Sequence, residues 1–174
     1  MHPNYVEESL DEIKRMHNLG INLVGELVPY ADGWNSYGCE EFSVLLDEIG
    51  KHNMIVSIHS IDGYGDTMDD VLKRHRDVIF VGAHPGEYKQ VMRHIEYMKA
   101  NENYYLDISG LGPHCYGMLR RAIDEVGVDR IIYGSDFPTC SPATFIGSVL
   151  LDPILTDAEK EKIFSINAKK LLQI

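Results

Sequence analysis

Hydrophobic positions along the chain alternate between two patterns. Short runs of consecutive apolar residues, many of them β-branched, are typical of strands that are buried on both faces of a sheet. Between these runs, apolar residues recur at intervals of three and four, which is the spacing of a helix with one buried face. The runs predict strands at residues 21–28, 54–59, 78–84, 104–108 and 130–134.

The helical pattern precedes the first predicted strand and follows each of the strands. It predicts helices at residues 6–19, 42–49, 68–72, 88–95, 119–126, from 141 onward, and over 156–172. Asn4 with Glu7, and Thr156 with Glu159, have the spacing of a capping box, in which two side chains complete the hydrogen bonding at a helix start. Strands that alternate with helices predict a parallel sheet with right-handed crossovers.

Two α/β architectures are compatible with this alternation. One is an open, doubly wound sheet, and the other is part of a (β/α)8 barrel, since a complete barrel takes about 250 residues. Val28-Pro29-Tyr30 follows the first strand where the open sheet would favour a Gly-rich phosphate loop. The 174 residues have the length of one domain. We therefore expect one partial TIM-barrel-like domain over residues 1–174, with five parallel strands alternating with helices.

Composition narrows the range of partners. The chain has 27 acidic residues against 16 Lys plus Arg, a formal net charge of −11, and no Lys or Arg run longer than two. This charge disfavours nucleic acid and anionic membranes as partners, and no stretch approaches the ~20 apolar residues of a membrane span. The cysteines, Cys39, Cys115 and Cys140, are odd in number and widely spaced, which argues against a disulfide framework and predicts a cytoplasmic protein.

Each predicted strand has an ionisable side chain at or just after its carboxyl end. These residues are Glu26, His59, His84, Asp107 and Asp136. Ligands of parallel α/β folds bind outside the carboxyl ends of the strands. Carboxylates and imidazoles are also the ligands that zinc, manganese and iron accept. One such residue alone would more often be structural, but the five together predict a metal or acid–base site.

Short motifs surround these strand ends and close the chain. They are Gly-Ser-Asp-Phe-Pro at 134–138, Ala-His-Pro-Gly at 83–86, Ile-His at 58–59 and Asn-Ala-Lys-Lys-Leu-Leu at 167–172. Together they resemble the amidohydrolase superfamily, in the branch that contains aminocarboxymuconate-semialdehyde decarboxylase and related metal-dependent hydrolases. The resemblance covers essentially the whole chain, whose five strands would be the fourth to eighth strands of the family's barrel.

The resemblance also implies roles for individual residues. His59 is implied as a metal ligand, His84 as a ligand or a polarising, substrate-facing group, and Asp136 as a metal contact that also transfers a proton. Glu26 occupies the position of a carboxylate that bridges two metals in some members. The implied cofactor is a divalent metal, zinc first, with manganese or iron as alternatives. The family's opening His-x-His is absent from this sequence, so we expect a truncated barrel that binds metal weakly.

The implied reaction is attack of a metal-activated water on a small carbonyl or carboxylate substrate, with Asp136 taking and returning a proton. Part of the branch decarboxylates its substrate with the same site. The alternative is a catalytically silent truncated barrel that acts only as an oligomeric or small-ligand-binding domain. In a partial barrel the strands at 21–28 and 130–134 would each lack a neighbour, so we expect a homo-oligomer that covers these edges.

Four further residues are candidates for contact with the small-molecule substrate. Trp34 and Tyr37, in the loop 29–38, are predicted to line a pocket mouth, because loops after barrel strands determine specificity. His114 is either a substrate contact or an exposed loop residue, and Asp107 is either a substrate contact or the cap of its loop. The histidines of the predicted helices are expected on solvated faces: His17, His52, His75 and His94.

Overall fold

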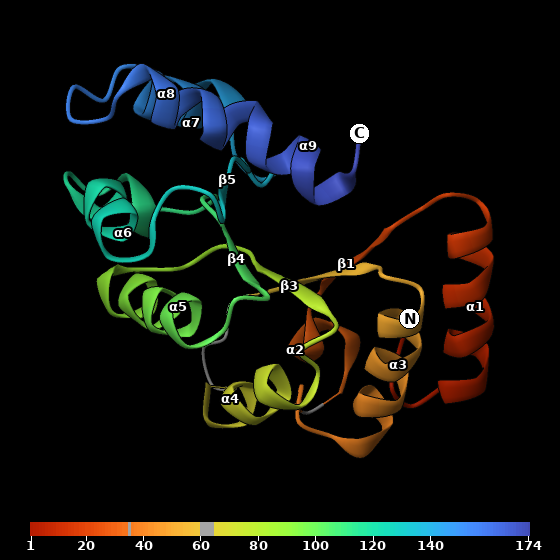
Figure 1. The fold of residues 1–174 in the computed structure, drawn as a ribbon. Helices are drawn as coiled ribbons and strands as arrows, with labels where there is room; N and C mark the ends of the chain where they lie inside the picture. Colours follow the sequence, from red (N-terminus) through yellow and green to blue (C-terminus); the bar gives the residue numbers. More distant parts are fainter. Residues whose placement is uncertain (35, 60–64) are drawn as a thin grey trace. The chain divides into compact units, whose positions relative to one another are not determined.

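The computed structural model describes residues 1–34, 36–59 and 65–174, which form two compact units (Figure 1). The N-terminal unit comprises Met1–Val81 and the C-terminal unit Gly82–Ile174. Strands and helices alternate along the chain in both units, and this confirms the predicted α/β class with five strands. None of the helices in the described ranges is both long and apolar enough to cross a membrane.

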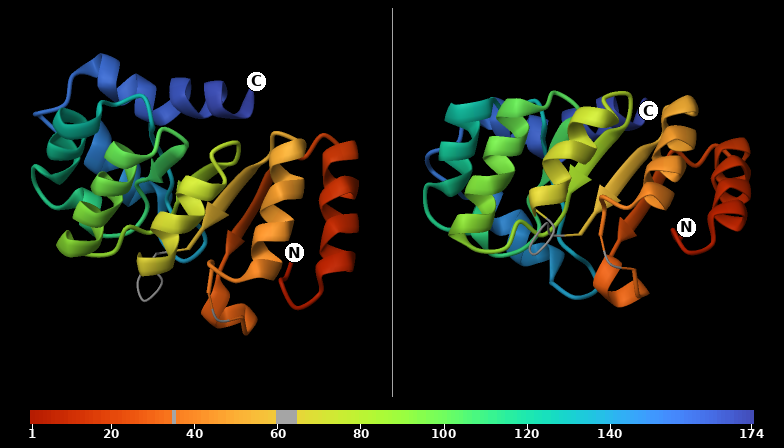
Figure 2. Two further views of the ribbon diagram at one scale, coloured as in Figure 1. Left: turned by 60° about the horizontal axis from the view of Figure 1, so that its bottom comes forward. Right: turned by 90° about the horizontal axis from the view of Figure 1, so that it is seen from below.

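The N-terminal unit packs helices against a parallel pair of strands. Its elements are α1 (Val6–Asn18), β1 (Leu23–Leu27), α2 (Pro29–Asp32), α3 (Glu40–Lys51), β2 (Ile55–Ile58), α4 (Gly65–Arg74) and β3 (Ile79–Gly82), which leads into the second unit. β1 and β2 are parallel, with Leu23 opposite Ile55, and the register shifts before Leu27 meets Ile58. Figure 2 shows α1 and α3 side by side, in agreement with the contacts between them.

The core of this unit follows the predicted helical stripe. Phe42, Leu45, Leu46 and Ile49 of α3 are completely buried, because their spacing places all four on one face of the helix. The expected capping box at Asn4 is wrong. The first helix begins at Val6 without a side-chain cap, since the Asn4 N–H instead donates to the His2 ring within the preceding turn.

The C-terminal unit contains two parallel strands and the remaining helices. Its elements are α5 (Tyr88–Ala100), β4 (Tyr104–Asp107), η1 (Gly112–His114), α6 (Met118–Val126), β5 (Ile131–Ile132), α7 (Pro142–Leu150), α8 (Asp157–Glu161), η2 (Lys162–Ile166) and α9 (Asn167–Leu172). β5 pairs with β4, with Leu106 opposite Ile131. It is shorter than predicted because the Tyr133 N–H leaves the sheet and donates to Ile163 O, 2.9 Å away.

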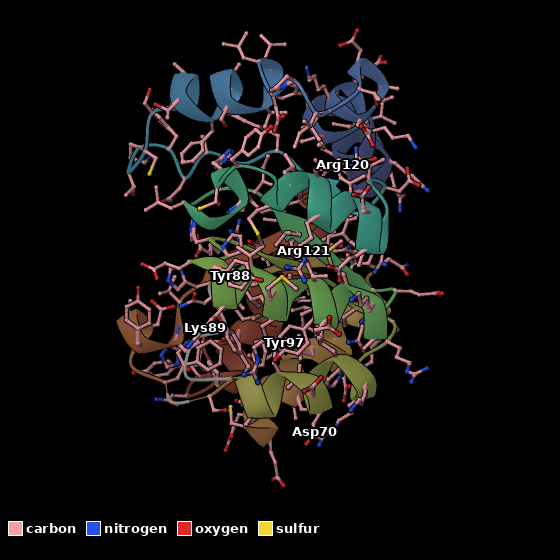
Figure 3. All side chains as sticks on the ribbon, turned by 90° about the vertical axis from the view of Figure 1, so that its left-hand side faces the viewer. Asp70, Tyr88, Lys89, Tyr97, Arg120 and Arg121 are labelled. Carbon is pink, nitrogen blue, oxygen red and sulfur yellow. The ribbon has the colours of Figure 1, made fainter. Side chains whose placement is uncertain are left out.

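Side chains fix the helices of this unit at their ends and along their surfaces. The capping box predicted at Thr156 is confirmed, since the Glu159 N–H donates to Thr156 Oγ1 and the Thr156 N–H to the Glu159 carboxylate. On the outer surface, Arg121 of α6 donates to the Tyr88 hydroxyl of α5 over 2.9 Å (Figure 3). Such exposed contacts contribute little to stability, so the helix pair depends mainly on its buried face.

Two of the helical histidines expected on solvated faces are buried, His75 in the N-terminal unit and His94 in the C-terminal unit. His94 continues the apolar stripe of α5 with Val91, Ile95 and Met98, so helical periodicity carries it into the core. Its Nδ1 lies 2.8 Å from the Tyr104 hydroxyl, which donates to it. Burial lowers the pKa of His94 from 6.5 to about 3, so the ring is neutral in the folded protein.

We expect this histidine to make the unit less stable in mild acid. Between pH 6.5 and about 3 the unfolded chain protonates His94 and the folded chain does not, so stability falls as the pH is lowered. The limiting slope is about 1.4 kcal/mol per pH unit. Urea unfolding followed by circular dichroism above and below pH 6.5 measures it. The free energy of unfolding should depend less on pH in His94→Phe, and as much as in the unaltered protein in the control His52→Gln. Equal slopes in the unaltered protein and both variants would contradict a buried, neutral His94.

Candidate functional site

In the N-terminal unit, the ends of two parallel strands bring Glu26 and His59 together. Glu26 is the penultimate residue of β1, and His59 follows directly after β2. The His59 N–H donates to Leu27 O over 2.9 Å, which extends the pairing of the strands by one residue. His59 Nδ1 is then hydrogen-bonded to Glu26 Oε1, with both side chains about one quarter exposed. The carboxylate thus fixes the orientation of the ring and leaves Nε2 to act as the donor atom for a ligand.

Two tyrosines surround His59, and one of them was not a sequence candidate. The Tyr30 hydroxyl lies 3.3 Å from His59 Nε2. The Tyr37 hydroxyl lies 3.0 Å from Leu27 O and 3.3 Å from His59 O, so it braces the backbone on which His59 stands. Tyr30 lies two residues beyond the apolar run 21–28, and this position gives no sign of a contact with His59. The contact arises because Tyr30 lies on α2.

Trp34 and Tyr37 are buried, although both line cavities of the N-terminal unit, Tyr37 one of about 80 Å³ and Trp34 one of about 590 Å³. Their exposed fractions are 4% and 1%, and the Trp34 ring packs against Tyr37 and Phe42 at centroid distances of 5.4 and 5.0 Å. The large rings of this segment therefore fill part of the core of the unit. Contact of either residue with a substrate stays a prediction.

In the C-terminal unit, His84 and Asp136 form a second pair. His84 lies two residues beyond β3, and Asp136 lies in the turn that follows β5. His84 Nε2 is 3.4 Å from Asp136 Oδ1, and the two side chains are 17% and 31% exposed. Both residues have left-handed backbone, with φ of 53° and 57°. Non-glycine residues rarely adopt this conformation, and where they do the strain is concentrated at active sites and ligand clamps.

Ser109 orients His84 and was not found by the sequence analysis. Its side chain is buried, and its Oγ lies 2.9 Å from His84 Nδ1 and 3.4 Å from the His84 backbone nitrogen. The serine therefore holds the ring with its Nε2 facing Asp136. The spacing Asp107-Ile108-Ser109 is the available signal, since Asp often accepts from the backbone N–H two residues later.

Asp107 is placed by the structure as the cap of its loop. Its Oδ1 accepts the Ser109 N–H over 2.6 Å, which is the second of the two roles considered for it. Gly134 passes so close to this carboxylate that a Cβ at Gly134 would overlap it. The glycine of the Gly-Ser-Asp-Phe-Pro motif is therefore required for close approach. A contact between Asp107 and a substrate stays a prediction.

His114 is half-buried, and both of its ring nitrogens are engaged. Nε2 lies 2.9 Å from Ile108 O, and Nδ1 lies 2.6 Å from Ser148 Oγ. Burial lowers the pKa of this ring, partly opposed by the hydrogen bond to the carbonyl. The residue lines a cavity of about 230 Å³ together with Cys115 and Leu151. Of the two alternatives for His114, the exposed loop residue is therefore wrong. Contact between His114 and a substrate stays a prediction.

The donor chemistry of the two pairs fits a divalent metal. Glu26 and Asp136 offer carboxylate oxygens, and His59 and His84 offer imidazole nitrogens, a set that zinc, manganese and iron all accept. Each histidine is also oriented by a neighbour through its Nδ1, as metal-binding histidines usually are. The four residues stand at the carboxyl ends of strands, as predicted, in two pairs that belong to separate units.

Solved structures share this fold. The chain resembles 5-carboxyvanillate decarboxylase from Sphingomonas paucimobilis, with a TM-score of 0.74, 16% identity, and coverage of 100% of this chain and 65% of that one. A dihydroxybenzoic acid decarboxylase from Polaromonas sp. JS666, solved with manganese and 2-nitroresorcinol, has a TM-score of 0.69 and 16% identity, and the match covers 97% of this chain and 66% of that one. An uncharacterised TIM-barrel protein from Bordetella bronchiseptica has a TM-score of 0.79 and 20% identity, and the match covers 97% of this chain and 63% of that one. These likenesses confirm a partial TIM-barrel fold, and the chain spans about two thirds of the length of these proteins.

A comparison at the level of sequence families identifies the chain more closely. None of the curated proteins matches it. The model of the amidohydrolase family, in contrast, matches residues 3–174, nearly the whole chain. This range includes both acid–histidine pairs and the closing motif at 167–172. The protein therefore belongs to the amidohydrolase family, as its motifs predicted.

Proposed function

We propose that the chain is a metal-dependent domain of the hydrolase or decarboxylase kind that acts on a small carboxylate or carbonyl substrate. The observation that carries the proposal is the His84–Asp136 pair, two ionisable side chains 3.4 Å apart on left-handed backbone. Such backbone is maintained only where the surrounding structure enforces it. Both residues also lie within the motifs that resemble the family, which supports a catalytic role for them.

The residues that would hold a divalent metal are Glu26 and His59 in the N-terminal unit and His84 and Asp136 in the C-terminal unit. Support comes from the carboxyl-end position of these residues, where ligands of parallel α/β folds bind, and from the family model, whose match includes all four. A divalent ion bound there would polarise a substrate carbonyl or carboxylate and lower the pKa of bound water. Zinc and manganese are the ions to test, manganese because the Polaromonas decarboxylase was solved with it.

The proton chemistry belongs to His84 and Asp136. In hydrolysis, Asp136 takes a proton from the attacking water and delivers it to the leaving group. In decarboxylation, the bond between the substrate carbon and its carboxylate breaks, and the electron pair left on carbon accepts a proton from the pair. Ser109 holds the His84 ring with Nε2 toward Asp136 in either reaction.

Aromatic acids with an ortho hydroxyl group are the first substrates to test. The named decarboxylases of similar fold act on 5-carboxyvanillate and 2,6-dihydroxybenzoate. Incubation with each acid in the presence of Mn²⁺ or Zn²⁺, followed by chromatography, detects loss of the carboxylate. Turnover that requires the metal is expected. Metal binding without turnover of any carboxylate or ester would favour the alternative, a catalytically silent ligand-binding domain.

Metal affinity provides a direct test of the donor set. His59→Asn should lower the affinity for Mn²⁺ at least about tenfold, because it removes a ligand nitrogen. Isothermal titration calorimetry measures this change, with His52→Asn, at the end of α3, as the matched control. Since the sequence contains no His-x-His, we expect the unaltered chain itself to bind weakly. A tightly held ion that survives dialysis, or equal affinity in the two variants, would contradict the prediction.

We further propose a homo-oligomer, one domain over 1–174 and a cytoplasmic location. Leu23 on β1 and Ile21 before it are 37% and 42% exposed, which is unusual for a strand next to a packed core and supports burial against a second copy. The three cysteines are free, which suits a reducing compartment. Light scattering should give a mass above the 19.7 kDa of one chain. A stable monomer at micromolar concentration would be the contrary result.

A further inference from the structure

A small cavity in the N-terminal unit lies beside the start of α3 and along α4. It has a volume of about 80 Å³, room for two or three waters or one acetyl-sized group. Ser43 and Cys39 line one wall, and His75, Arg74 and Asp70 line another, with Asp70 labelled on α4 in Figure 3. None of the residues proposed above as metal ligands lines this cavity.

Ser43 and His75 of the cavity wall form a serine–histidine–aspartate relay with Asp47, which lies outside the cavity and is 65% exposed. Ser43 Oγ lies 2.7 Å from His75 Nε2, and His75 Nδ1 lies 3.2 Å from Asp47 Oδ1. Ser43 and Asp47 are four residues apart on α3 and so share a helix face, which the histidine after α4 meets. With Nδ1–H donating to the carboxylate, Nε2 is left to accept the Ser43 proton. Nucleophile, base and orienting carboxylate thus stand in the order used by serine hydrolases.

The electrostatic surroundings suit a neutral base. Burial lowers the pKa of His75, and Arg74 lowers it further, while Asp47 and Asp77 oppose the shift. The ring is therefore uncharged at neutral pH and ready to accept a proton. Burial raises the pKa of the Cys39 thiol in the same cavity, which keeps it protonated and makes it a poor nucleophile. Arg74 supplies a positive charge at the cavity wall for an oxyanion.

We propose that Ser43 is an acylation site and that this cavity hydrolyses small activated esters of acetyl size. Ser43 Oγ forms a bond to the acyl carbon while its proton passes to His75 Nε2. The carbon–oxygen bond to the leaving alcohol breaks, and the departing oxygen takes that proton. Water then attacks the acyl-serine by the reverse sequence of proton transfers and releases the acid. Asp47 is a positioning residue that holds the histidine tautomer.

The probe is p-nitrophenyl acetate, with a chelator present so that ester hydrolysis by a bound divalent metal does not contribute. Mass spectrometry of the digested protein should find one acetyl group on the peptide that contains Ser43. Ser43→Ala should lower both the labelling and the release of nitrophenolate at least about a hundredfold. Ser36→Ala is the matched control, since Ser36 contacts Thr67 of the cavity wall and shows no bond to His75.

The positioning role of Asp47 has its own readout. Because its charge raises the pKa of His75, Asp47→Asn should move the midpoint of the pH–rate profile to lower pH, with Ser43 still the labelled residue. Wild-type labelling in folded Ser43→Ala, acetyl groups only on lysines, or an unchanged midpoint in Asp47→Asn would overturn the proposal. These outcomes are independent of the metal-dependent reaction, which the chelator removes.

Discussion

Replacing Asp136 by asparagine is expected to lower kcat/KM of the metal-dependent reaction by about 10²–10⁴-fold, the usual contribution of a positioned acid or base. The amide has nearly the same shape as the carboxylate but takes up no proton. It also faces His84 Nε2 over 3.4 Å without the charge that would stabilise a protonated ring. Initial rates with the aromatic acid that gives the highest turnover measure the loss.

Asp124→Asn is the matched control for this variant. Asp124 is an exposed residue of α6 that pairs with Arg120 over 2.8 Å, so its loss should leave kcat/KM unchanged. Circular dichroism of both variants excludes unfolding as the cause of a lower rate. Asp136→Asn with activity close to that of the unaltered protein would remove Asp136 from the mechanism and leave proton transfer to another group.

Trp34→Ala should produce the largest loss of stability, about 3–5 kcal/mol, the range for replacing a buried tryptophan by alanine. The ring is 4% exposed and contacts Tyr37 and Phe42, so its removal leaves a cavity between packed aromatic rings. Urea unfolding should be followed by circular dichroism, because Trp34 is the only tryptophan and fluorescence would disappear with it.

The same variant separates the two roles considered for Trp34. Tyr116→Ala is the control, since Tyr116 is 84% exposed and its loss should change stability by less than about 0.5 kcal/mol. A Trp34→Ala protein that unfolds at the wild-type urea concentration but has a raised KM would assign the ring to substrate binding. A large loss of stability, in contrast, gives it the packing role that its burial indicates.

Local sequence patterns were sufficient for the order of elements and for the strand-end residues. Apolar runs identify every strand, because most strand residues are buried, and an ionisable residue at or just beyond each run marks its carboxyl end. The end of β5 was missed because a hydrogen bond from Tyr133 to Ile163, thirty residues away in sequence, removes it from the sheet. Such a partner is defined only by tertiary structure.

The residues that support the site were harder to predict than the site itself. Ser109 contacts His84 and Tyr30 contacts His59, and in neither case does the spacing in the chain indicate that histidine as the partner. His94 is the contrary case, since it lies three residues after Val91 and so on the buried face of α5, although it was predicted to be solvated. The place of a histidine in the helical repeat therefore predicts its burial better than the polarity of its side chain does.

The left-handed backbone at His84 and Asp136 has a consequence for engineering this protein. Glycine adopts this conformation without the roughly 1–2 kcal/mol that other residues lose there. A library selected for heat resistance alone should therefore enrich glycine or asparagine at positions 84 and 136, and the enriched chains should be catalytically dead. Stability selection on this fold must be coupled to an activity screen, or these two positions must be held fixed.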